Sequence, residues 1–150
     1  MSNKQDIINK LTEAYWKEIE TVQNYIALSV NLDGIQAKEI KESLAADIDE
    51  ELGHAKELAR RIKELGGTVP GSKAFKAEQS YLQTPQDTTN ILAVINGVLE
   101  AEEDAIKTYS EIIKLADGQD YVTQDLAIRL LADEEGHREE FTSFLREFKK

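Results

Sequence analysis

Two stretches of the sequence decide the fold: Glu51-Leu52-Gly53-His54 and Glu134-Glu135-Gly136-His137. They hold the only two histidines of the 150-residue chain, and each histidine follows a glutamate by three residues within a long helix-forming run. Residues three apart on a helix project from the same side, so a carboxylate oxygen and an imidazole nitrogen can reach one metal ion. The two turns therefore predict a buried site for paired metal ions between helices.

The two stretches belong to a longer internal repeat. An acid precedes each candidate glutamate ligand, as Glu50 and as Asp133, and Gly53 stands at the same place before its histidine as Gly136. Glycine inside a helix costs about 0.8–1 kcal/mol relative to alanine. The matched glycines therefore predict a close backbone approach beside each histidine.

The repeat also supplies two further acids, each followed seven residues later by a tyrosine: Glu18 with Tyr25, and Glu102 with Tyr109. Each glutamate lies inside an apolar stripe with i+3/i+4 spacing. Carboxylates are almost never fully buried unless they are paired or bound to metal, so both are candidate ligands; the alternative is an edge position that reaches water. We expect the tyrosines to donate hydrogen bonds to ligand carboxylates, while a plain aromatic role in the core remains open.

Composition sets the frame around this site. At 150 residues, the chain is expected to form a single domain over residues 1–150. The absence of cysteine excludes disulfides, iron–sulfur clusters and zinc–thiolate sites. No apolar run reaches the length of a signal peptide or a membrane span, which predicts a cytoplasmic protein with no membrane partner. The net charge of −11 argues against a nucleic-acid partner and suits a protein that gathers metal cations.

Helical periodicity predicts four helices, over residues 4–31, 36–65, 88–116 and 119–148. Gly66-Gly67 is the expected end of the second helix, and Asp87-Thr88 is the expected N-cap of the third. Residues 68–88 are too apolar for a free linker and are long enough to travel the length of a bundle. Two antiparallel hairpins joined by this crossover predict an all-α, antiparallel four-helix bundle.

The chain resembles the ferritin-like di-iron carboxylate proteins along essentially its whole length, closest to the bacterioferritins and Dps-like ferritins. Residues 18–25, 49–55 and 131–137 carry this resemblance. It implies six metal ligands, with Glu51 and Glu134 bridging two metals, Glu18 and His54 completing one end, and Glu102 and His137 completing the other. The neighbouring acids Glu100 and Glu103 are alternatives to Glu102, which we prefer for its place on the apolar stripe.

The activity implied by the resemblance is that of a ferroxidase, which oxidises Fe(II) with O2 or H2O2 for iron storage or detoxification. The expected cofactors are two iron ions per subunit, for which manganese or zinc can substitute. The alternative is a rubrerythrin-like di-iron peroxidase without a storage shell. Its electron donor would be another protein, because the chain has no rubredoxin cysteines.

Two departures from the family pattern affect haem and assembly. Bacterioferritins bind haem through a methionine directly after the first motif glutamate, and Leu52 stands there in this chain. We therefore expect no methionine-ligated haem. The fourth helix is expected to end near Lys149-Lys150 with no fifth helix, which favours a twelve-subunit shell over a twenty-four-subunit cage.

The first predicted helix carries a second apolar line, Trp16, Ile19, Ile26 and Val30, that faces away from the metal ligands. The combined apolar arc is wider than one core contact needs. We expect a homo-oligomer in which this line forms a two-fold dimer across Trp16, within a larger shell. The alternative is that the crossover, with Phe75 and Tyr81, folds over the line.

Overall fold

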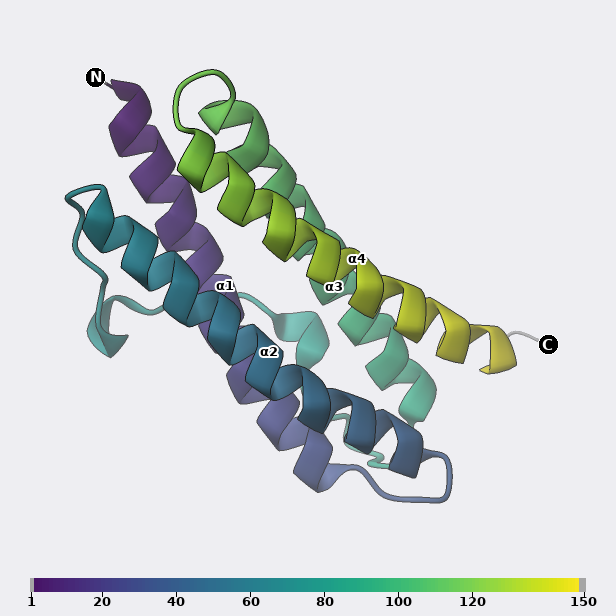
Figure 1. The fold of residues 1–150 in the computed structure, drawn as a ribbon. Helices are drawn as coiled ribbons and strands as arrows, with labels where there is room; N and C mark the ends of the chain where they lie inside the picture. The colour runs from purple at the N-terminus through teal and green to yellow at the C-terminus, as the bar shows by residue number, and fades with distance from the viewer. Residues whose placement is uncertain (1, 149–150) are drawn as a thin grey trace.

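The computed structural model describes residues 2–148 and consists of four long helices with two short 3-10 helices between the second and third (Figure 1). The elements in chain order are α1 (Ser2–Asn31), α2 (Ala37–Glu64), η1 (Ser72–Ala74), η2 (Ser80–Leu82), α3 (Ile91–Ala116) and α4 (Tyr121–Phe148). Helix α1 packs along α2, and α3 packs along α4, while α1 also contacts α3. The predicted antiparallel four-helix bundle with a long crossover is confirmed (Figure 1).

The structure corrects the predicted starts of α3 and α4. Helix α3 begins at Ile91, because the N-cap is Asn90, whose side chain accepts a hydrogen bond from the N–H of Ala93, and not Asp87-Thr88. The Asp87 carboxylate instead accepts from the backbone of Thr89 and closes the turn before the helix.

Helix α4 begins at Tyr121 and not at residue 119. The N–H groups of Gln119 and Asp120 both bond to the carbonyl of Ala116, which ends α3 in a turn. The end of the second helix follows the prediction, since α2 ends at Glu64, Leu65 is its C-cap and Gly66 then adopts a positive φ of 90°. The expectation of no fifth helix concerns Lys149 and Lys150, which lie outside the described residues.

The crossover is fixed to the bundle at two places. The buried carboxylate of Glu20 on α1 accepts hydrogen bonds from the backbone N–H groups of Glu78 (2.9 Å) and Gln79 (2.8 Å). At the second place, the crossover passes close to α3. A Cβ atom at Gly97 of α3 would clash with the carbonyl oxygen of Tyr81, so the close approach requires glycine there. The crossover is therefore part of the packed fold.

The expectation of an exposed apolar line centred on Trp16 is corrected in part. Phe75 of the crossover packs edge-on against the Trp16 ring, with 5.1 Å between ring centroids, as the alternative interpretation held. The far end of the line remains open to solvent, because Ile26 is 49 % exposed and Val30 is 71 % exposed. The unpartnered apolar surface of α1 therefore lies toward its C-terminal end.

Two apolar clusters fill the bundle, one toward each end. One is built around Tyr25, Leu44, Ile95 and Phe141, and the other around Leu11, Leu58, Ile112 and Leu130. Along every helix, the buried acids and histidines fall between the two clusters, so they form a polar layer across the middle of the bundle. Within residues 2–148, none of the helices combines the length and apolar character needed to cross a bilayer.

Candidate metal centre

All four helices contribute to the central polar layer. Its six predicted ligands are Glu18 from α1, Glu51 and His54 from α2, Glu102 from α3, and Glu134 and His137 from α4. Each of them is at most 7 % exposed. The alternatives Glu100 and Glu103 are exposed, so the helical phase of α3 turns Glu102 alone of these three acids into the bundle. The structure thus brings all six residues together.

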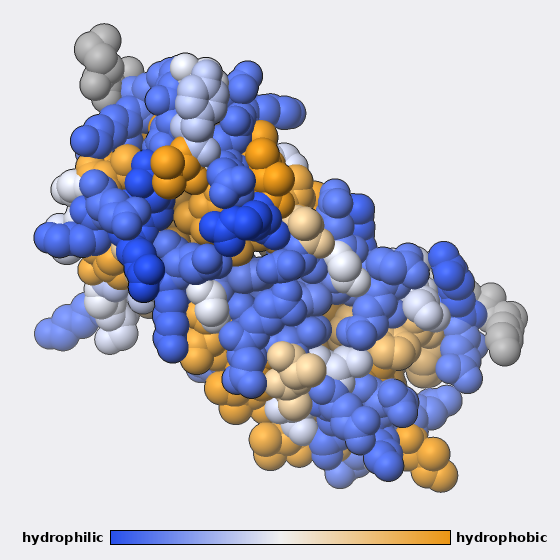
Figure 2. Space-filling model, viewed as in Figure 1, coloured by the Kyte–Doolittle hydropathy of each residue, from blue (hydrophilic) through white to orange (hydrophobic). Residues whose placement is uncertain are grey.

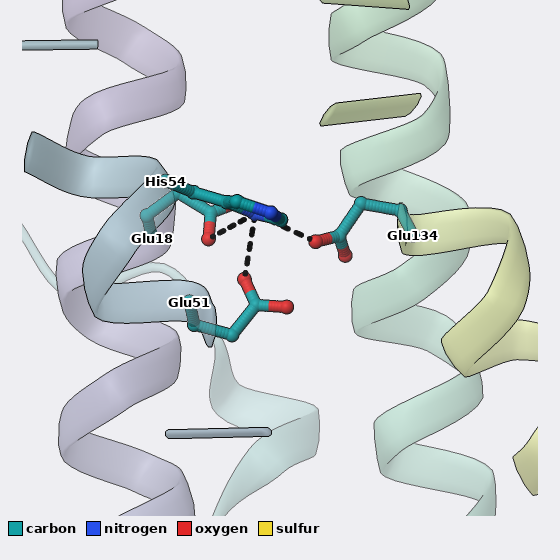
Figure 3. A group of neighbouring side chains, drawn as sticks. All are labelled: Glu18, Glu51, His54 and Glu134. Carbon is teal, nitrogen blue, oxygen red and sulfur yellow. Dashed lines mark ion pairs between the residues drawn. The ribbon is translucent and has the colours of Figure 1, made fainter. Parts of the chain in front are cut away.

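The first group surrounds the Nδ1 atom of His54 (Figure 3). This nitrogen lies 3.2 Å from Glu134 Oε1, 3.5 Å from Glu18 Oε2 and 3.7 Å from Glu51 Oε2. Figure 3 shows the ring directed from α2 across the bundle toward Glu134 on α4. Three carboxylates from three helices therefore converge on one imidazole nitrogen.

The second group surrounds the Nδ1 atom of His137. This nitrogen lies 3.1 Å from Glu51 Oε1, 3.8 Å from Glu102 Oε2 and 3.9 Å from Glu134 Oε1. In each group, the candidate ligand atoms all lie within 4.8 Å of one another. The two groups share Glu51 and Glu134, so they form adjoining halves of a single site.

Unpartnered polar atoms test whether this site suits metal ions. Each of the six residues has one buried nitrogen or oxygen atom without a hydrogen-bond partner, including Nδ1 of both histidines. Leaving such atoms unsatisfied is costly, more so for charged groups, and buried polar atoms normally have partners. Metal coordination would satisfy all six atoms at once. The donor set of four carboxylates and two imidazoles therefore fits a pair of divalent cations.

Two buried tyrosines hold the carboxylates at the ends of the site. The hydroxyl of Tyr25 donates to Glu102 Oε1 and the hydroxyl of Tyr109 donates to Glu18 Oε1, each at 2.8 Å. The expected hydrogen bonds to candidate ligands are present. Each tyrosine reaches the glutamate of the opposite hairpin, and not the one that precedes it in sequence.

The outer nitrogens of the histidines are also paired across the hairpins. His54 Nε2 lies 2.9 Å from Asp133 Oδ2, and His137 Nε2 lies 2.9 Å from Glu50 Oε2. A carboxylate on the outer nitrogen keeps the proton there and leaves Nδ1 free to bind metal. The sequence analysis noted both acids but did not predict this role; their position directly before the shared glutamates is the signal that could have revealed it.

Burial and mutual repulsion dominate the electrostatics of the shared carboxylates. Burial, followed by the charge of Glu18, raises the pKa of Glu51 well above its usual value. Burial, followed by the charges of Glu51 and Glu18, likewise raises the pKa of Glu134. Burial and the neighbouring Glu134 raise the pKa of Glu102. Without metal, the site therefore retains protons on its carboxylates.

For Glu18 and the two histidines, the neighbouring groups shift the pKa in the direction opposite to the shift that burial alone would cause. Burial alone would raise the pKa of Glu18, but its interactions with Glu51 and His54 and the hydrogen bond from Tyr109 outweigh burial and lower that pKa. Burial alone would lower the pKa of both histidines. The nearby carboxylates of Glu134, Glu18 and Glu51 instead raise the pKa of His54, because they stabilise its charged form. Nearby carboxylates, Glu102 first, raise the pKa of His137 to about 9.

The prediction of close backbone packing beside the histidines is wrong. A Cβ atom at Gly53 or at Gly136 would have nothing within 4 Å. Gly136 is exposed and Gly53 is partly exposed, because the residue directly before an inward-pointing histidine lies about 100° around the helix from it. Nothing in the structure explains the matched glycines.

The fold and this site together define a class, the four-helix bundle with paired Glu-x-x-His turns and two shared carboxylates at its centre. The chain belongs to the ferritin-like domain family, whose family model matches residues 8–150. It is 31 % identical over 146 residues to the DNA protection during starvation protein of Pyrococcus furiosus, covering 94 % of this chain and 77 % of that one. It is 29 % identical over 135 residues to the bacterioferritin of Desulfovibrio desulfuricans, covering 89 % of this chain and 71 % of that one.

Solved structures show the same fold. A dodecameric thioferritin from Bacteroides fragilis superimposes with a TM-score of 0.87 at 24 % identity, over 97 % of this chain and 88 % of that one. A ferritin-like di-iron carboxylate protein from Bacillus anthracis superimposes with a TM-score of 0.85 at 23 % identity, over 97 % and 99 % of the two chains. The ferritin-like arrangement of helices expected from the sequence is thus confirmed.

Proposed function

We propose that the chain is a ferroxidase, which oxidises Fe(II) with O2 or H2O2 at the central site in the service of iron storage or detoxification. The supporting observation is the pair of buried groups that share Glu51 and Glu134. Because Glu51 and Glu134 belong to both groups, each of them would help to hold both ions. Glu18 with His54 and Glu102 with His137 complete the two ends.

Charge balance favours two divalent ions in this place. Two Fe(II) ions bring four positive charges, and the four glutamates of the site bring four negative ones. The filled site is neutral, which removes most of the cost of burying isolated charge. Hard carboxylates with one imidazole per ion favour iron or manganese, with zinc as a competitor. No methionine-ligated haem is included in this proposal, since Leu52 stands at that position.

The residues of the chain hold the ions, exclude water and fix the ligands. Each bound Fe(II) supplies one electron, so that one H2O2 takes two electrons and two protons and leaves as two water molecules. Tyr25 and Tyr109 keep the end carboxylates in place through their hydroxyl groups. In the neutral imidazole that binds metal, Asp133 and Glu50 would hold the remaining proton on the outer nitrogen of each histidine, so that the inner nitrogen is the one that faces the ions.

Anaerobic titration with Fe(II) tests the proposal. We expect saturation at two equivalents per chain, followed by oxidation of both ions when O2 or H2O2 is added. The exposed Glu135, which lies next to a proposed ligand, provides the matched control as Glu135→Gln. Saturation at one equivalent or none, or equal losses in the control and in a Glu134→Gln variant, would contradict the assignment.

A rubrerythrin-like peroxidase without a storage shell is the second candidate, because the same site could consume H2O2 with electrons from a partner protein. The two functions differ in what happens to the iron. Storage requires many ferric ions retained per chain in a hollow assembly, whereas a peroxidase returns its two ions to Fe(II). Light scattering together with the iron retained after repeated oxidation separates these outcomes.

We also propose that the chain forms a homo-oligomer, with a dimer along α1 inside a larger shell, twelve subunits being favoured. The dodecameric relative has the same fold. The exposed Ile26 and Val30 are the apolar part of α1 available for such a contact, whereas Trp16 packs against Phe75. A Val30→Glu variant should lower the mass measured by light scattering. An unchanged mass would remove this surface from the proposal.

The name of the Pyrococcus furiosus relative refers to DNA protection. With a net charge of −11, this chain is repelled by phosphate backbones. We therefore propose that any protection it gives comes from removing Fe(II) and oxidant. A mobility-shift experiment should detect no complex with duplex DNA at low salt, and a stable complex would contradict this view.

A further inference from the structure

Ile35 has the most exposed large apolar side chain within residues 2–148, at 97 %. It lies in the turn between α1 and α2, directly after Gly34, whose positive φ of 104° makes the turn possible. A single exposed isoleucine is unremarkable, but an exposed isoleucine beside an apolar pocket marks a surface that another molecule can cover. The surroundings of Ile35 therefore decide whether it has a role.

Ile35 borders a pocket of about 240 Å³ between the start of α2 and the end of α4. Two firmly held apolar side chains line it: Ile40, which is 3 % exposed, and Phe144, whose ring packs edge-on against Phe141 with 5.2 Å between centroids. Figure 2 shows apolar side chains at this corner, beside the α1–α2 turn and near the end of α4, while the centre of the same face is mostly hydrophilic. The pocket and Ile35 thus form one apolar surface.

The charged side chains of this corner differ between the two sides of α2. Glu39 and Glu147 line the pocket, which has no basic residue in its lining. A second hollow beside the turn is lined by two lysines and two acids, Lys38, Lys41, Asp33 and Glu42. At about 100° per residue, positions 38, 41 and 42 lie on the opposite side of α2 from positions 39 and 40. The corner therefore has an acidic pocket on one side and lysines on the other.

These opposite charges have no partners of their own. Within residues 2–148, no ion pair includes Lys38, Lys41, Glu39 or Glu147. The lysine side of one copy is thus complementary to the acidic pocket of another. Such a contact joins two different surfaces of the same chain, so it repeats from copy to copy and closes into a ring around a symmetry axis.

We propose that the pocket receives the α1–α2 turn of a second copy of this chain. The lysines of the incoming turn face Glu39 and Glu147, and Ile35 at the edge of the pocket is buried between the two copies. This inference rests on the homo-oligomer of the proposed function and supplies a contact that the dimer along α1 cannot. A two-fold contact joins only two copies, whereas a shell needs a second contact with a different symmetry.

Native mass spectrometry of variants at the two contacts tests the inference. Ile35→Asn keeps a similar size but buries an amide without a partner, so the shell should be lost and the dimer along α1 should remain. Val30→Glu should have the converse effect and leave rings that lack the two-fold contact. The matched control is Ile35→Leu, which retains an apolar side chain and should retain the shell.

Exchange of charges tests which surfaces meet. Glu147→Lys and Lys38→Glu should each lower the mass from that of the shell to that of the dimer, because like charges then face each other across the contact. The two substitutions together should restore the shell, since opposite charges face each other again. The control is Lys107→Glu, which reverses an exposed charge on α3 outside both hollows and should leave the mass unchanged.

Three results would overturn the inference: a wild-type protein no larger than a dimer, a shell that survives Ile35→Asn, or a double charge variant that assembles no better than the single ones. The proposed function fails in a different way. All six candidate ligands belong to one chain, so every variant should still bind two equivalents of Fe(II). Loss of Fe(II) binding in the wild type would contradict the di-metal site whatever the mass. Circular dichroism confirms the fold of each variant.

Discussion

The two ends of the central site contain the same residue types in different surroundings. Nδ1 of His54 has three carboxylate oxygens within 3.7 Å, whereas Nδ1 of His137 has one at 3.1 Å and two more at 3.8 and 3.9 Å. The outer side of His137 adds the buried Asp47, whose counterpart in the repeat is the core residue Leu130. A duplicated sequence therefore supplies a symmetrical set of ligands, while the tertiary packing draws the carboxylates closer around His54 than around His137.

The largest expected effect comes from a carboxylate that serves both ends. Glu51→Gln keeps the shape of the side chain but removes a charge from both groups. Losing one partner of a buried charged pair costs about 3–5 kcal/mol, so we expect both tight ions to be lost. Anaerobic Fe(II) titration measures the stoichiometry. Retention of one tight ion would show that Glu51 belongs to a single end.

The histidine variants compare the two ends directly. His54→Ala and His137→Ala should each remove one tight ion and leave the bundle folded. We expect the larger loss of affinity from His54→Ala, because this ring faces the more compact carboxylate group. Calorimetric titration with Mn(II) gives both constants. Equal losses from the two variants would mean that the ends do not differ in the way proposed.

Metal-free protein should lose stability as pH rises. The pKa values of Glu51, Glu102 and Glu134 are raised in the folded state above the usual 4.5, so the folded protein binds these protons more tightly than the unfolded chain does. Their contribution to the free energy of unfolding is present below pH 4.5 and is lost as pH rises through the folded pKa values. The apo protein should therefore melt at a higher temperature at pH 5 than at pH 8.

Metal should reverse this loss, because it binds the folded site and not the dispersed ligands. A ligand at 100 times its dissociation constant stabilises by about 2.7 kcal/mol, which corresponds to a rise in Tm of roughly 5–11 °C for a chain of this size. Thermal melts at pH 8 with and without Mn(II) check the value. In Glu51→Gln, both the pH dependence and the rise with metal should shrink. An unchanged Tm in the wild type would contradict the picture of a buried carboxylate site.

The smallest effects on metal affinity are expected from the tyrosine variants. Each should weaken the end of the site whose glutamate lies on the opposite hairpin. Tyr109→Phe removes the donor to Glu18 and should weaken the His54 end, while Tyr25→Phe removes the donor to Glu102 and should weaken the His137 end. Loss of such a supporting contact typically weakens metal affinity about 10–100-fold. The exposed Tyr121→Phe is the control. Mn(II) titration checks the affinities, and a loss at the same-hairpin end would contradict the observed pairing.

Most of the site could be predicted because its residues are related by local helix geometry. Glu-x-x-His spacing fixes a glutamate and a histidine on one helix face, and the apolar stripe selects Glu102 from a run of acids. The matched glycines misled the analysis, because a glycine at a regular place in a repeat does not by itself indicate close packing. Asp47 was missed because it lies four residues before Glu51 and has no acidic counterpart in the repeat.

By itself, the sequence determined the four helices, their pairing into hairpins and the six residues that meet at the centre, since helix periodicity and i,i+3 spacing act over a few residues. Only the tertiary structure decided which tyrosine reaches which glutamate, which acid holds each histidine, and that the crossover covers Trp16. These contacts join residues 59 to 91 positions apart. Their partners depend on how two hairpins and a crossover pack, which no local pattern records.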